Sequence, residues 1–152
     1  MKREAIVAYS FGGSVDRPGP SNIAFGNIIN RLVDETQSQK YTVVVQDFIQ
    51  FCVNEKPDLV VGDGEYISTQ RITSEFEIFL EEEGISNVLL IAHPFLHFVQ
   101  CKRLLEKRGF AVQRVKTGWI PFDPDCENWW VRGPLHLLLY ALLQIAFGRQ
   151  DR

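Results

Sequence analysis

The sequence predicts an α/β fold, a three-layer Rossmann-like domain with a parallel sheet of about five strands and helices on both faces. Short apolar segments alternate along the chain with longer segments of helical periodicity, and glycine and proline separate them. The length of 152 residues suits one domain, so we expect a single domain over residues 1–152. Alternation of this kind predicts parallel strands joined by right-handed crossovers.

The expected strands are short, apolar or β-branched, and bounded by turn residues. They cover residues 5–10, 42–45, 59–61, 88–92 and 111–115. The first run ends before a Gly-Gly pair and the third before Gly62-Asp63-Gly64, as expected for buried strands that stop at turns.

Helices are expected where apolar residues recur every three or four positions. Ser21 is a good N-cap for the first helix. The apolar positions of that helix are Ile23, Phe25, Ile28, Ile29 and Leu32. A short helix is expected over residues 46–54, a longer one over 70–83, and another from Pro94 to Gly109. Pro94 suits a first helical turn, and Gly109 suits a C-terminal cap.

Charge and cysteine content exclude several classes of protein. The net charge of −3 argues against a general nucleic-acid binder, which would show a basic face. Cys52, Cys101 and Cys126 form no CxxC pair, so we expect no disulfide framework and a reducing, cytoplasmic location. The apolar run that follows Glu4 is shorter than the core of a signal peptide.

An aromatic loop over residues 117–131 leads to an apolar C-terminal segment, residues 132–148. His136 and Gln144 interrupt this segment, and it is shorter than the ~20 residues that cross a bilayer, so no transmembrane segment is expected. We expect a buried helix that closes the fold. Contact with a membrane surface is the alternative.

Two of the three histidines lie where the fourth strand gives way to a helix, in the segment from Ile91 to His97. Ligands bind at the carboxyl edge of a parallel sheet, and histidine moves protons near neutral pH. We therefore predict a catalytic role for His97, with His93 as its helper. Structural histidines bonded to backbone are the alternative. The i, i+4 spacing suits a metal pair, but no third ligand is evident, so no metal site is predicted.

The loop after the first strand contains Ser10, Gly12, Gly13 and Ser14. Glycines let backbone N–H groups approach an anion closely, which makes these residues candidate ligand contacts. The loop carries neither the dinucleotide fingerprint nor the Walker pattern, and an ordinary turn is the alternative.

Ser68 and Thr69 are candidate caps of the helix after the third strand, and its free N–H groups suit a phosphate or carboxylate. Arg71 lies in the first turn against the preference of the helix dipole, which indicates an anionic ligand or a simple pair with Glu75. In the aromatic loop, Asp123 is the polar candidate for ligand binding. The loop itself is either a wall of the site or a cover for an apolar edge.

The glycine loop, the Ser68-Thr69 segment and the His-bearing turn together resemble the YdcF-like (SanA/ElyC/YdcF) family, a domain of unknown function, over residues 6–122. The family's central motif is of the Asn/Ser-Thr-x-Glu-Asn type, and Arg71 stands here in place of the acidic residue. Its later motif is His followed three residues on by Arg, whereas Gln100 follows His97. The resemblance implies a divergent member with a nucleotide-binding-like fold, a pocket at the strand C-termini and, in bacteria, a link to envelope metabolism.

These segments predict a domain that binds or transforms a small anionic ligand, phosphorylated or nucleotide-like, at the carboxyl edge of the sheet. The hypothesis requires the segments near residues 12, 69 and 97 to meet around one cavity. Two alternatives stay open. One is a module that binds a nucleotide or S-adenosylmethionine without turnover, and the other is a scaffold that associates through the aromatic loop and the last helix. The sequence identifies no cofactor, and it is compatible with a homo-oligomer.

Overall fold

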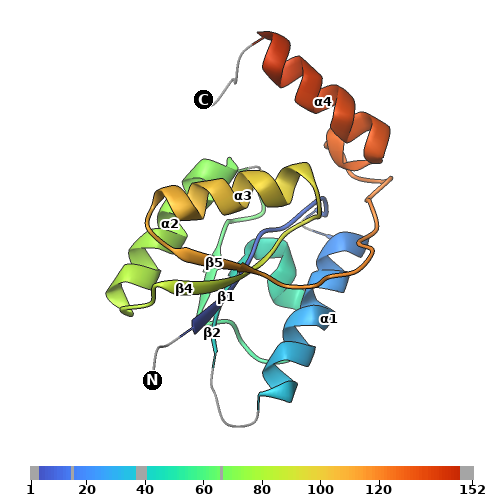
Figure 1. The fold of residues 1–152 in the computed structure, drawn as a ribbon. Coiled ribbons are helices and arrows are strands. Elements are labelled where there is room, and N and C mark those ends of the chain that lie inside the picture. The colour runs from blue at the N-terminus through green and yellow to red at the C-terminus, as the bar shows by residue number, and fades with distance from the viewer. Residues whose placement is uncertain (1–3, 15, 37–40, 66, 148–152) are drawn as a thin grey trace.

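A computed structural model describes residues 4–14, 16–36, 41–65 and 67–147 of the chain. Five parallel strands form one sheet in the order β3-β2-β1-β4-β5 (Figure 1). The strands are β1 (Glu4–Ala8), β2 (Thr42–Gln46), β3 (Leu59–Val61), β4 (Asn87–Ile91) and β5 (Ala111–Arg114). The predicted α/β Rossmann-like fold is therefore confirmed, and the strand order reverses at β1.

The central strand, β1, explains why the first apolar run has no polar side. Val7 pairs with Val44 of β2 and with Leu90 of β4, so both edges of β1 are hydrogen-bonded. Ala5, Val7 and the following Tyr9 pack on one face of the sheet, and Ile6 and Ala8 pack on the other. Since successive side chains point to opposite faces, a strand covered on both sides must be apolar throughout.

One face of the sheet is covered by α2 (Thr69–Glu82) and α3 (Leu96–Lys107) (Figure 1). The buried side chains that these helices contribute are Ile72, Phe76, Leu80, Phe98, Cys101 and Leu105. They recur every three or four residues, as predicted for amphipathic helices. An ion pair also joins the two helices, because Arg108 Nε lies 2.8 Å from Glu77 Oε2.

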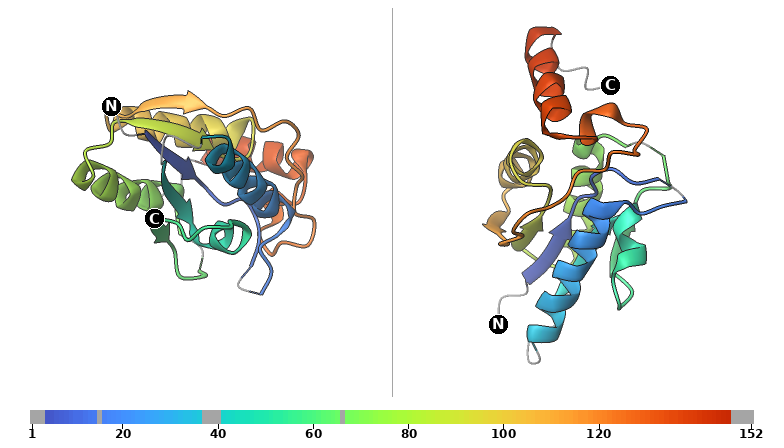
Figure 2. Two further views of the ribbon diagram at one scale, coloured as in Figure 1. Left: turned by 90° about the horizontal axis from the view of Figure 1, so that it is seen from below. Right: turned by 90° about the vertical axis from the view of Figure 1, so that its right-hand side faces the viewer.

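The other face is covered by α1 (Pro20–Glu35) and by η1 (Asp47–Cys52), a short 3₁₀ helix (Figure 2). Phe25, Ile28 and Ile29 of α1 share one apolar cluster with Ile49 of η1. Ile23, which we expected on the apolar face, is 47% exposed. The helix turns this position outward because Phe25 and Ile29 take the positions that face the sheet.

Two helices begin at residues that differ from the predicted ones. Gly19, and not Ser21, is the N-cap of α1, because the Ser21 hydroxyl donates to the carbonyl of Pro121. The helix after β4 begins at Leu96 and not at Pro94, because Phe95 has a φ of 74°, outside the helical region.

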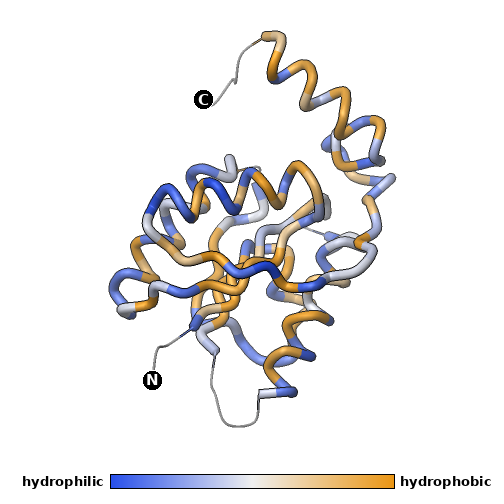
Figure 3. The backbone as a smooth tube through the Cα atoms, in the orientation of Figure 1, coloured by the Kyte–Doolittle hydropathy of each residue, from blue (hydrophilic) through white to orange (hydrophobic). Residues whose placement is uncertain are grey.

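The C-terminal helix, α4 (Pro134–Phe147), follows a 3₁₀ turn, η2 (Trp129–Val131), and projects from one end of the domain (Figures 1 and 2). The expectation that this helix is buried is wrong: Leu135 is 77% exposed, Phe147 is 80% exposed and only Leu137 is buried. Figure 3 shows α4 as apolar along most of its length. The expected end at Gly148 lies outside the described residues. Within the described part of the chain, no helix is long and apolar enough to span a membrane.

A close contact between α1 and η1 makes Gly26 sensitive to substitution. A Cβ atom there would lie 2.3 Å from the Cys52 carbonyl oxygen, so Gly26→Ala must separate the two elements. We expect a loss of about 1–3 kcal/mol in the free energy of unfolding, although alanine favours a helix by about 1 kcal/mol over glycine. Urea unfolding measures the change in the free energy of unfolding. Asn27→Ala, at an exposed position in the same helix, is the control. Equal stability of Gly26→Ala and wild type would contradict the contact.

Candidate functional site

His93 follows β4 at the carboxyl edge of the sheet and is enclosed by aromatic rings. Its side chain is 1% exposed. The ring stacks on Phe11, with centroids 4.0 Å apart, and is tilted against Phe122 at 4.5 Å. Nδ1 lies 3.2 Å from the Pro94 carbonyl oxygen, whereas Nε2 is buried without a hydrogen-bond partner among the described residues. A buried polar atom without a partner costs about 1–3 kcal/mol, so Nε2 is the unsatisfied group of this site.

His97 lies one turn further on, in the first turn of α3. Its ring centroid is 5.6 Å from that of Phe11 and 6.3 Å from that of Tyr9. Nε2 is 3.8 Å from the sulfur of Cys101, a buried residue on the next turn of the helix. The structure therefore brings His93 and His97 together around the segment that follows β1.

Burial keeps both histidines neutral near pH 7. It lowers the pKa of His93 to about 4, and the nearby backbone of Pro94 and Ile120 offsets only part of this effect. Burial also lowers the pKa of His97 to about 4, and the charge that His93 would carry lowers it further. A neutral imidazole has one N–H donor and one nitrogen that accepts, so the pair suits hydrogen bonding or proton transfer. Without a positive charge, the two rings do not attract an anion electrostatically.

Two residues that the sequence analysis did not select join this site to α2. The Tyr9 hydroxyl lies 2.8 Å from Thr73 Oγ1, which donates to the Thr69 carbonyl oxygen at 2.6 Å. Burial raises the pKa of Tyr9, so the phenol stays protonated. Tyr9 continues the alternation of Ala5 and Val7, and this period of two was the available signal for its position on the α2 side.

The start of α2 has the predicted cap but no free cation. Ser68 Oγ accepts from the backbone N–H of Arg71 at 3.3 Å, and Thr69 is the first helical residue. Arg71 is exposed, with Nε 3.6 Å from Glu75 Oε1. The simple alternative for Arg71, a pair with Glu75, is therefore what the structure contains.

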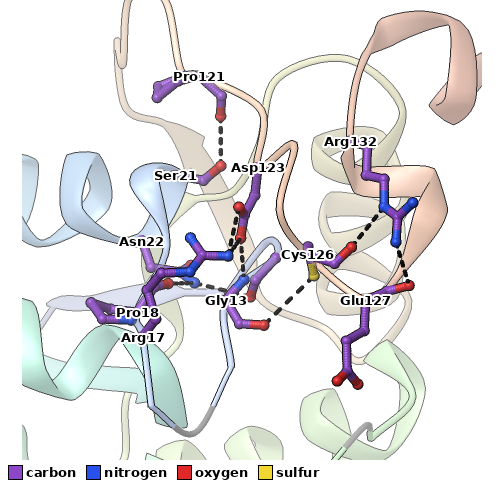
Figure 4. A network of polar contacts seen from close by, with 11 residues as sticks. Gly13, Arg17, Pro18, Ser21, Asn22, Pro121, Asp123, Cys126, Glu127 and Arg132 are labelled. Atoms are coloured by element: carbon purple, nitrogen blue, oxygen red, sulfur yellow. Dashed lines mark hydrogen bonds and ion pairs between the residues drawn. The ribbon is translucent and has the colours of Figure 1, made fainter.

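The glycine loop binds a carboxylate of the chain itself (Figure 4). Asp123 is fully buried, and its Oδ2 accepts from the Gly13 N–H at 2.8 Å. Arg17 Nη2 donates to both carboxylate oxygens, at 2.9 and 3.1 Å. Gly12 and Gly19 have positive φ, and a Cβ on either would lie within 2.9 Å of the Asp123 side chain. We call this arrangement the Asp123 clasp.

The Asp123 clasp changes the roles expected for this loop. The N–H of Gly13 and the side chain of Asp123 contact each other, so neither is available to a ligand in this arrangement. Asn22, fully buried in α1, holds the same loop: its Oδ1 accepts from Phe11 N, and its Nδ2 donates to the carbonyls of Gly12 and Pro18.

The two flanking serines are engaged by backbone hydrogen bonds. Ser10 N donates to Gln46 Oε1 at 3.0 Å. Ser14 forms a β-bridge with Arg17, which is also the cation of the Asp123 clasp. These bonds hold the loop in place and involve main-chain atoms of both serines, so a role of their hydroxyls in ligand binding stays a prediction.

The turn between β4 and α3 is strained and carries exposed apolar side chains. Phe95 combines a φ of 74° with a ψ of −121°, a conformation that bulky residues rarely adopt, and it is 68% exposed. Trp119 is 75% exposed, and its ring lies 6.4 Å from that of Phe122, which contacts His93. Strained residues cluster at functional sites, and this turn adjoins both histidines.

The two most distinct cavities among the described residues lie away from the histidines. One cavity, of about 450 Å³, lies at the opposite edge of the sheet, where Tyr41 and Asp58 line it. A second, shallower one lies between β3 and α2, lined by Val61 and Phe79. At the histidines, rings of Phe11 and Phe122 fill the space. Among the described residues, no group of three or more His, Cys, Asp or Glu side chains is arranged to hold a metal ion.

Comparison with known proteins shows the fold alone. No protein-family model and no curated protein matches the sequence. A Listeria monocytogenes protein provisionally assigned as a UDP-N-acetylglucosamine 2-epimerase has a similar crystal structure, with a TM-score of 0.52 and 17% sequence identity. The similarity covers 76% of this chain but only 30% of that protein. It supports the Rossmann-like architecture and assigns no activity.

Removal of the Asp123 carboxylate should destabilise the domain. Asp123→Ala leaves the Gly13 N–H and Arg17 without their acceptor, and we expect a loss of about 3 kcal/mol, moderated because Arg17 is 39% exposed. Denaturant unfolding measures this loss. Asp125→Ala removes an exposed carboxylate of the same loop and should change stability by less than about 0.5 kcal/mol. Equal effects of the two variants would contradict the clasp.

The buried histidines should make stability depend on pH. Their folded pKa of about 4 is below the unfolded value of 6.5, so the unfolded chain binds more protons between these values. The free energy of unfolding should therefore fall from pH 7 to pH 5, by about 2 kcal/mol for each histidine.

His93→Phe should keep the ring contacts and remove about half of this pH dependence. Thermal unfolding at both pH values measures the difference, and His136→Gln, at an exposed position, is the control. A His93→Phe variant with the wild-type pH dependence would show that His93 is not buried neutral.

Proposed function

We propose that this domain binds a small anionic, nucleotide-like ligand at the carboxyl edge of the sheet, beside His93 and His97. The unpaired, buried Nε2 of His93 is the observation that carries the proposal. A ligand that supplies its partner would recover the cost of that orphaned atom. The ring of Trp119, exposed beside Phe122, offers a surface on which a base can stack.

The anionic part of the ligand would bind the start of α2 and not the glycine loop. The Asp123 clasp occupies the N–H of Gly13, whereas the first turn of α2 follows Ser68 and Thr69 at the same edge of the sheet. A helix N-terminus favours phosphate or carboxylate. The hydrogen bonds from Tyr9 to Thr73 and on to Thr69 tie this turn to the segment that contacts both histidines.

The protein of similar fold is named as an epimerase of UDP-N-acetylglucosamine, a nucleotide sugar. This similarity supports a nucleotide-like ligand only by analogy of fold. Membership of the YdcF-like family belongs to the same proposal. It is supported by the arrangement of the three resembling segments, which follow β1, β3 and β4 and so lie at one edge.

If the site performs a reaction, His97 is the group that would move a proton. It is neutral near pH 7 and adjoins His93. Its side chain is partly exposed to solvent, whereas that of His93 is buried. The second candidate is a module that binds a nucleotide or S-adenosylmethionine without turnover. The departures from the family motif at Arg71 and Gln100 favour this candidate, and Arg71 pairs with Glu75.

Thermal unfolding with UDP, AMP, S-adenosylmethionine and inorganic phosphate tests the proposal. We expect one nucleotide-like compound to raise the melting temperature, by several degrees when it is present at about 100 times its dissociation constant. His97→Ala and Thr69→Ala should abolish the rise, and His136→Ala should retain it. Mass analysis of the recovered compound separates the candidates, because an altered compound indicates an enzyme and an unchanged one a binding module. A rise that survives both site substitutions would refute the site.

A further inference from the structure

The exposed face of α4 carries a regular row of leucines. Leu135, Leu138, Leu139, Leu142 and Leu143 recur at the i, i+3, i+4, i+7 and i+8 positions of one helix face. Each is at least 38% exposed, and α4 contains no charged residue between Pro134 and Phe147. We call this face the leucine stripe.

The opposite side of α4 packs against the tryptophans of η2, the turn that precedes it. Trp130 stacks on Tyr140, with ring centroids 4.9 Å apart and planes 21° from parallel. Trp129 makes edge contacts with His136 and Tyr140 at 6.4 and 6.0 Å. Leu137 is buried on this side. These contacts and Leu137 lie on one side of α4, and the leucine stripe lies on the other side, turned away from the domain.

The root of α4 is anchored to the same loop as the Asp123 clasp. Arg132 Nε donates to the Cys126 carbonyl at 2.7 Å, and the Cys126 thiol contacts the carbonyl of Gly13 (Figure 4). These hydrogen bonds join the segment that leads into α4 to the glycine loop.

The leucine stripe is an exposed apolar patch of the size that marks an interaction surface. With Ile145 and Phe147, seven large apolar side chains of α4 are exposed. These side chains are between 38% and 81% exposed. At roughly 100 Å² for each full side chain, they offer on the order of 400–500 Å². A stable interface takes about 800 Å² from each partner, so this helix supplies more than half of that area. A helix of this length also gains little stability by itself in water.

We propose that α4 pairs with α4 of a second copy of this chain, with the two leucine stripes in contact. An uncharged leucine stripe is complementary to itself, which suits a two-fold symmetric interface. Helices that lie on membranes carry lysine or arginine on their polar face, and α4 has neither. The net charge of −3 also disfavours an anionic surface. This inference goes beyond the proposed ligand site and is independent of it.

Sedimentation equilibrium of the full chain tests the pairing. We expect a dimer, and we expect Leu139→Glu combined with Leu142→Glu to raise its dissociation constant by roughly 100-fold or more, because the carboxylates would be buried without partners. Phe51→Glu, at an exposed apolar position on η1, should leave the dimer intact. Far-UV circular dichroism and thermal unfolding of each variant show whether the domain is folded.

Cross-linking gives a second measurement that does not depend on charged substitutions. Leu139 lies at the middle of the leucine stripe, so Leu139→Cys should form a disulfide between copies in either helix orientation, whereas Phe51→Cys should not. A wild-type monomer up to millimolar concentration would overturn the proposal, as would a dimer unchanged by the double substitution. A monomer that sediments with phosphatidylcholine and phosphatidylglycerol vesicles would also overturn it, in favour of a membrane.

Discussion

The hydrogen bonds of the Asp123 carboxylate are the interaction on which the course of the aromatic loop depends. It joins the glycine loop to a residue 110 positions further along the chain. The carboxylate is fully buried, and burial of a charge is tolerated only when donors surround it. The Gly13 N–H and Arg17 provide those donors. The aromatic loop can place Asp123 here only because Gly12 and Gly19 have no side chains, and the buried carboxylate in turn holds the glycine loop in place.

This dependence explains why the candidate site is enclosed. Phe122 precedes Asp123, so the clasp holds its ring against His93 while Phe11 of the glycine loop covers the other side. The two rings exclude water and keep the imidazole neutral. The donors of the glycine loop are thus satisfied by a carboxylate of the same chain. The unsatisfied polar atom lies instead in the turn after β4, at His93. Ligand selectivity would then come from neutral hydrogen bonds and aromatic surface more than from charge.

The same loop continues into the base of α4, so the site and the leucine stripe share one support. Movement of the loop would alter both the cover over His93 and the direction of α4. The domain body tolerates the strained turn at Phe95 and the unpaired Nε2 because its central strand is covered on every side. Local costs of about 1–3 kcal/mol for each feature are small beside the burial of such a core.

The sequence by itself determined the sheet and the helices that cover it, because apolar periodicity reports which faces are buried. It also placed His93 and His97 correctly beside each other and near the glycine loop, since parallel strands end at one edge. Only the tertiary structure decided the partners of Asp123, the bond of Ser21 to Pro121, and the exposure of α4. These features depend on contacts between residues about a hundred positions apart, or on the absence of a surface to cover an apolar helix. A local pattern contains neither kind of information.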